Sequence, residues 1–323
     1  ALFNIFGNLS ALDPILKKYG YMAASERNGM KIAIARDIAI QADAYAWDAF
    51  FNREGRIINP GNVEKLIKSF TNTYALDRLG HLKNAGYTKK SDKEGVRMAI
   101  ARDLVLRPNA WKNFFDPLGN MVDQKKVKAL FDVILPNVSR GIFSEKIEIP
   151  GSEYVKAGYI MAIARELVEY PQKWSGFFDK NGNIVKGNNH VKTLFGVILK
   201  NKDIIDNYLL HIDGKRTGFY TGSSSLEKSG MITPIARDLA VKIDSKEKLV
   251  EELDYRKKIF DVADANKVTL YEDHLPYFSE YSRKIFKEYG EIYKGKTGRE
   301  LTLDIMFKNI AYALKVYPVA GED

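Results

Sequence analysis

The chain has 323 residues, a formal net charge of +9 and no cysteine. Hydrophobic residues make up 45% and charged residues 28%, the balance of an ordinary globular protein, which excludes a disordered tail, a collagen and a disulfide-stapled mini-protein. The absence of cysteine also excludes thiolate nucleophiles and cysteine-based metal sites.

The first residues, 1–7, carry no basic region and no long apolar run, so we expect no signal peptide. No stretch of the chain reaches the roughly 18 uncharged apolar residues that a membrane-spanning helix needs. These features predict a soluble protein that is synthesised in the cytoplasm and has no membrane span.

One short phrase, typically Ala-Ile-Ala-Arg-Asp-Leu, occurs four times along the chain. Its arginines recur at similar intervals, as Arg36, Arg102, Arg165 and Arg237. In the first three copies a tryptophan follows, then a phenylalanine pair, a turn with glycine and an apolar pair. These tryptophans, the only three in the chain, are Trp47, Trp111 and Trp174. Self-similarity at a fixed period is the signature of repeat proteins, so the sequence predicts tandem duplication.

The predicted fold is mainly α-helical, a tandem array of three similar repeats of about 64 residues each, a degenerate fourth repeat and a helical C-terminal region. The fourth repeat keeps the arginine but has lost the tryptophan, the phenylalanine pair and the glycine turn, as expected of a terminal unit with a polar outer face. The predicted segments are an N-terminal segment (1–19), repeats one to three (20–85, 86–150 and 151–217), the fourth repeat (218–265) and the C-terminal region (266–323).

Within a repeat we expect three helices. The first begins near a glycine, at Gly29 or Gly95, and ends before a proline such as Pro108 or Pro171. A short second helix is expected to hold the Trp-x-x-Phe-Phe segment. After the glycine turn, an apolar pair predicts a very short strand, and a closing helix follows, in repeat two through 127–134.

The recurring arginine lies in an apolar helix, so its charge must be paired or reach solvent. Four arginines in a row on one surface would bind a polyanion, whereas a buried arginine would form a structural contact in each repeat. An acid follows every arginine, and a phosphate-binding row gains nothing from matched acids. These acids are Asp37, Asp103, Glu166 and Asp238. The structural interpretation is therefore favoured.

The tryptophans and phenylalanine pairs also allow two interpretations. Exposed rings at a regular spacing would stack on bases or sugars. Rings of this size among Leu, Ile and Val are more often the core of each repeat, and we expect the core.

Residues 290–297 match the phosphate-loop pattern G-x-x-x-x-G-K-[ST]. That loop requires a strand before it, but residues 278–287 show the pattern of an amphipathic helix, so we expect a glycine-rich basic turn. The turn at 179–183 lacks a Glu at the final calcium-ligand position, which predicts turn chemistry instead of a metal site.

The remaining polar candidates indicate no catalytic group. Ser223–Ser225 lies in a stretch without the G-x-S-x-G pattern and is expected to be a linker. No histidine stands in an HExxH context and none recurs between repeats; the four are His81, His190, His211 and His274.

We therefore predict a non-catalytic structural or assembly protein with no catalytic, cofactor-binding or metal-binding residues. The expected partners are other proteins or further copies of the chain, in an oligomer or a larger assembly. A virion component, such as a phage tail, neck or internal protein, is one context that fits. The alternative is a nucleic-acid-binding repeat protein that uses the excess of basic residues.

Overall fold

The computed structural model describes residues 2–40, 47–151, 153–187, 189–212 and 235–265. The chain is mainly helical, which confirms the predicted class, and these described ranges contain no β-strand beyond isolated bridges. It divides into two compact parts, an N-terminal domain (Ala1–Gly196) and a C-terminal domain (Val197–Asp323). Within the described ranges no helix combines the length and apolarity that crossing a membrane requires.

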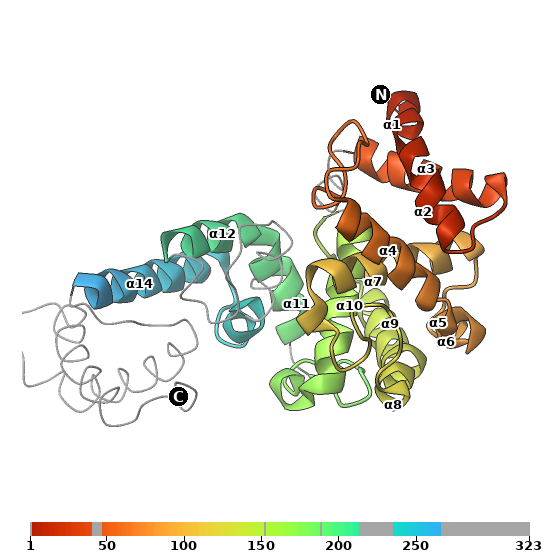
Figure 1. Ribbon diagram of the computed structural model, residues 1–323. Helices are drawn as coiled ribbons and strands as arrows, with labels where there is room; N and C mark the ends of the chain where they lie inside the picture. The colour runs from red at the N-terminus through yellow and green to blue at the C-terminus, as the bar shows by residue number, and fades with distance from the viewer. Residues whose placement is uncertain (1, 41–46, 152, 188, 213–234, 266–323) are drawn as a thin grey trace, which may run out of the picture. The chain divides into compact units, whose positions relative to one another are not determined.

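Figure 1 shows the helices in chain order. The α-helices are α1 (Leu2–Asn8), α2 (Asp13–Lys18), α3 (Ala24–Ala39), α4 (Pro60–Asn72), α5 (Ala75–Arg78), α6 (His81–Asn84), α7 (Lys90–Leu106), α8 (Gln124–Lys128), α9 (Leu135–Ser144), α10 (Glu153–Glu169), α11 (His190–Thr193), α12 (Lys202–His211) and α14 (Lys246–Ala265). The 3₁₀ segments are η1 (Leu9–Leu12), η3 (Pro108–Ala110), η5 (Pro171–Trp174) and η7 (Leu199–Asn201), and the π-helical segments are η4 (Ala129–Ile134) and η6 (Leu194–Ile198).

The arginine-bearing helices start earlier than the glycines that we expected to open them. Helices α3 and α7 begin more than one turn before Gly29 and Gly95. The added turn is largely polar and exposed, and a glycine inside a helix costs only about 1 kcal/mol, so the helix continues through it.

The expected second helix is wrong. In repeat two a single 3₁₀ turn, η3, starts at Pro108, and the chain then reverses. The backbone N–H groups of Phe114 and Phe115 both donate to the carbonyl oxygen of Trp111, at 2.8 and 2.9 Å. The two donors converge on one oxygen, so the tryptophan and the phenylalanine pair form a tight turn.

We call residues 47–58, 111–122 and 174–185 the Trp turns. Each closes with one antiparallel bridge, in place of the very short strand that we expected; the bridges are Phe51 with Ile57, Phe115 with Met121, and Phe178 with Ile184. Each also contains a glycine with a positive φ angle, which residues with a side chain rarely adopt: Gly55 (80°), Gly119 (85°) and Gly182 (86°). In each, one side-chain oxygen accepts two backbone N–H bonds across the turn; the accepting residues are Asn52, Asp116 and Asp179.

Each Trp turn lies against a helix that precedes it in the chain. A Cβ atom added at Gly119 would be 2.6 Å from the carbonyl oxygen of Ser69 in α4. A Cβ atom added at Gly55 would be 2.9 Å from the carbonyl oxygen of Ile5, and one added at Gly182 would be 2.7 Å from that of Ile134. An asparagine one turn later on each of these helices donates its Nδ2–H to a turn carbonyl at 2.8 Å; the pairs are Asn8 with Glu54, Asn72 with Leu118, and Asn137 with Asn181.

The π-helical segment η4 explains a change in spacing between repeats one and two. Ser69 and Ile134 are equivalent residues that each contact the glycine of the next Trp turn. Their separation in the sequence is one residue longer than that of Val63 and Val127, which lie near the starts of the same two helical segments. The extra residue enters between these positions, where η4 replaces α-helix. A π-helical turn accommodates an added residue, so the contact with the next turn is kept.

We predict that Gly119→Ala destabilises the N-terminal domain more than Gly187→Ala does. Both glycines have a φ of 85°, so both alanines incur about 1–2 kcal/mol of left-handed strain. Only Gly119 also meets a backbone atom, which adds about 1–3 kcal/mol of overpacking, whereas a Cβ at Gly187 meets nothing within 4 Å. Urea unfolding followed by tryptophan fluorescence measures the difference, and equal losses would contradict the close contact.

Candidate functional site: the arginine–tryptophan contacts

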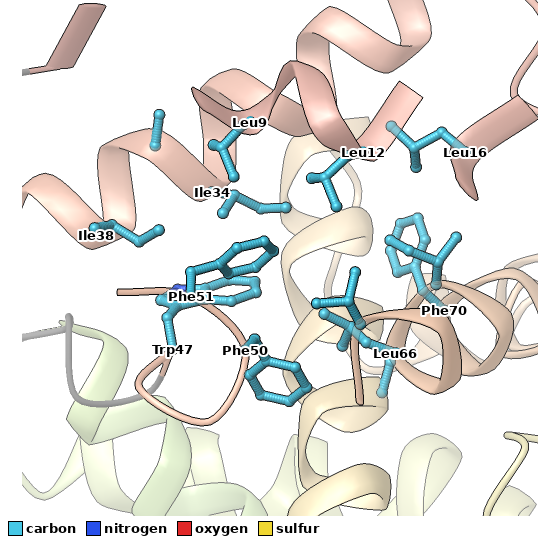
Figure 2. Close-up of a cluster of buried hydrophobic side chains, with 14 of the residues drawn as sticks. Leu9, Leu12, Leu16, Ile34, Ile38, Trp47, Phe50, Phe51, Leu66 and Phe70 are labelled. Carbon is cyan, nitrogen blue, oxygen red and sulfur yellow. The ribbon is translucent and has the colours of Figure 1, made fainter. Parts of the chain in front are cut away.

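The three tryptophans are buried, and each packs on the phenylalanine pair of its own turn. Their exposed fractions are 0–1%, and those of the six phenylalanines do not exceed 1%. In the first turn the ring centroids of Trp47 and Phe50 are 6.0 Å apart in an edge-on arrangement. Figure 2 shows Trp47 and Phe51 lying below Ile34 and Ile38 of α3. Rings so deeply buried are not available for stacking on bases or sugars.

Two of the four recurring arginines lie over the tryptophan of the preceding repeat. The Cζ atom of Arg102 is 5.1 Å from the ring centroid of Trp47, and that of Arg165 is 4.9 Å from Trp111. Both arginines are buried, with exposed fractions of 4% and 9%. A guanidinium group over an indole in a desolvated place is stabilised by about 2 kcal/mol, so this contact connects neighbouring repeats.

In α7 and α10 the acid that follows the arginine binds the next tryptophan along the chain. The indole Nε1–H of Trp111 donates to Oδ2 of Asp103 at 3.4 Å, and that of Trp174 donates to Oε2 of Glu166 at 2.8 Å. Adjacent helical residues point to different faces, so an arginine and its acid reach two different tryptophans. Trp111 consequently contacts Asp103 through its N–H and Arg165 through its ring.

Asp103 is the charged centre of the contact between repeats two and three. Its Oδ2 accepts a hydrogen bond from Nη2 of Arg107 at 2.7 Å. Burial acts to raise the pKa of Asp103, but the positive charges of Arg107, Arg165 and Arg102 outweigh burial and hold this pKa below its ordinary value. Burial and the nearby Arg107 lower the pKa of Arg165 in turn. The carboxylate therefore compensates a group of arginines that would otherwise be costly to bury.

The remaining two recurring arginines are Arg36 and Arg237. Arg36 is exposed, although its sequence position matches that of Arg102. Arg237, in the C-terminal domain, is 7% exposed and its Nε donates to Oδ1 of the adjacent Asp238 at 3.0 Å. The four arginines thus do not form one exposed row.

Several residues singled out in the sequence lie outside the described part of the chain. They are the phosphate-loop match at 290–297, Ser223–Ser225 and His274. At the turn 179–183, the Asp179 carboxylate accepts the backbone N–H groups of Asn181 and Asn183. In the described ranges no group of three or more His, Asp or Glu side chains could hold a metal ion.

The described histidines make individual polar contacts. Nδ1 of His81 is 2.8 Å from Oδ1 of Asp132, Nδ1 of His190 is 2.9 Å from the carbonyl oxygen of Gly176, and Nε2 of His211 is 2.7 Å from Oδ1 of Asp261. Each of these contacts joins two segments that are distant in the sequence, so the three histidines have an evident structural role.

The sequence analysis missed the asparagines that hold the Trp turns. Asn8, Asn72 and Asn137 recur at nearly the same period as the tryptophans, and that period would have revealed them. It also missed a second cation over an aromatic ring: Lys31 lies 5.3 Å from the centroid of Phe6, and Arg97 lies 4.4 Å from that of Phe70. The positions Phe6 and Phe70 are again one repeat period apart.

No protein-family model, curated protein sequence or solved structure matches the chain.

We predict that Arg102→Ala lowers the free energy of unfolding by about 2–4 kcal/mol, because it removes the contact with Trp47 and leaves a cavity. Arg36→Ala is the matched control, because it changes the equivalent but exposed residue and should stay within about 0.5 kcal/mol of the native chain. Urea unfolding of both variants provides the measurement. Similar losses in the two variants would contradict a special role for the buried arginine.

We predict that Asp103 makes the stability of the N-terminal domain depend on pH. Its folded pKa lies below the unfolded value of about 3.9, so its stabilisation is present above that value and is lost as the pH falls through it toward the folded pKa. Asp103→Asn should cost about 3–5 kcal/mol at pH 7 and clearly less at pH 3. Urea unfolding at pH 7, 5, 4 and 3 measures the difference in unfolding free energy between the variant and the native chain. A difference that is independent of pH would contradict this role of the Asp103 carboxylate.

Proposed function

We propose that the chain is a non-catalytic structural or assembly protein built from helical repeats in tandem, the fourth of them degenerate. It presents equivalent surfaces to protein partners or to further copies of itself, and a virion component is a context that fits. The proposal is supported by the positions and contacts of the recurring residues. The tryptophans and phenylalanines form the interior, and Arg102 and Arg165 connect one repeat to the tryptophan of the one before.

Equivalent positions also recur on the surface. Ile58 and Val122 occupy the same place in the first two Trp turns, and their side chains are 53% and 60% exposed. In both turns the backbone N–H of this residue donates to a phenylalanine carbonyl, of Phe50 and Phe114 respectively, which fixes its position. Exposed apolar side chains presented at matched points of successive turns suit contacts with a protein partner.

The nucleic-acid-binding alternative gains no support from the recurring arginines. Arg102, Arg165 and Arg237 are buried, and only Arg36 of the four is exposed. The net charge of +9 remains as the argument for this alternative.

The proposal predicts that the purified chain forms an oligomer or a larger assembly, which light scattering coupled to size-exclusion chromatography would detect. A chain that remains an inert monomer at high concentration would count against an assembly role. Tight binding to DNA or RNA that weakens steeply with added salt would support the alternative instead.

A further inference from the structure

Within the part of the chain that the structure describes, α3 and the residue that follows it have a face that is bare, whereas the same face is covered on α7 and α10. Aligned on the recurring arginine, this face consists of Ile32, Ala33, Arg36, Ala39 and Ile40, all exposed. The five equivalent residues of α7, and the five of α10, are all buried or partly buried. The core-facing residues do not differ in this way, because Ile34, Ala35 and Ile38 are as buried as their counterparts.

The contacts of α7 show what covers this face. Met98, Val105 and Leu106 pack against the cluster of buried side chains that contains Trp47. Between them Arg102 lies over the ring of Trp47. On α10 the arginine again lies over a tryptophan, Trp111. In both places the cover includes the Trp turn of the preceding repeat.

The bare face of α3 has the composition that such a cover requires. Ile32 and Ile40 are 53% and 45% exposed, and Arg36 lies between them with small alanines alongside. A face-to-face pairing of two α3 helices is disfavoured because it would bring Arg36 close to its own copy.

We propose that this face of α3 is a docking surface for a further Trp turn, of the kind that covers the equivalent face of α7 and α10. The docked indole lies against the guanidinium group of Arg36, and aliphatic side chains around it cover Ile32 and Ile40. The internal contacts of α7 and α10 are the template for this arrangement. The inference rests on the proposed assembly role and deepens it, because it states which surface accepts a further Trp turn and by what chemistry.

The test supplies the missing cover by tethering it to the complete chain. Residues 47–65, which contain the first Trp turn and the start of α4, are duplicated and fused directly before Leu2. The join is in register because Leu2 stands one repeat period before Leu66, the same interval that separates Ile5 from Ser69. Tethering gives a high effective concentration, so even a weak preference for the face is detected.

If the face accepts a Trp turn, the grafted chain melts at least about 4 °C above the native chain. Its added indole is then shielded from acrylamide quenching as well as the native three are. In the grafted chain, Ile32→Asp should abolish both effects. Leu79→Asp is the matched control, since Leu79 has a similar exposed fraction of 48% but lies outside both the face and the Trp turns, and it should leave both effects in place.

An added indole that acrylamide quenches freely, with no rise in melting temperature, would overturn the proposal, as would equal effects of Ile32→Asp and Leu79→Asp. The outcome is separable from that of the assembly experiment. A native chain that stays monomeric, together with a shielded graft, would refute assembly between copies while retaining the docking surface.

Discussion

The stacking of a buried guanidinium group on an indole is the interaction that organises the N-terminal domain. It is long-range in the sequence, since it connects Arg102 with Trp47 and Arg165 with Trp111. A buried arginine is tolerated only when its charge is compensated. The ring supplies part of that compensation for Arg102 and Arg165, and the Asp103 carboxylate supplies more. In α7 and α10 the Arg–acid pair thus contacts two tryptophans, the one that precedes it in the chain and the one that follows.

The second constraint is the close approach of each Trp turn to the helix before it. A glycine without a side chain allows backbone contact, and an asparagine then fixes the turn through its amide, as Asn72 does with the carbonyl of Leu118. The guanidinium contact is made to the tryptophan of a turn, and the backbone contact is made at its glycine. Together they restrict both the distance and the rotation between consecutive segments, which hydrophobic burial alone does not do.

The helical class and the recurring landmarks were predictable because apolar periodicity and composition are local signals. The tight turn around Trp111 was not, because the convergence of two N–H groups on one carbonyl leaves no mark in the residue types. From the sequence alone, the exposed Arg36 also could not be distinguished from the buried Arg102. The arginine of the same dipeptide is exposed in one helix and buried in the other, where the Trp turn of residues 47–58 covers it.

The π-helical segments also bear on the order in which the repeats arose. Repeats two and three both have a π-helical segment in the closing helix, η4 and η6, whereas α4 of repeat one is regular α-helix. The sequence interval from Val127 to Val191 equals that from Ile134 to Ile198, so these two repeats share the added residue. In a chain that grew by duplication, a single ancestral insertion accounts for this pair. On that account repeats two and three descend from one common copy that had already gained the residue, whereas repeat one does not.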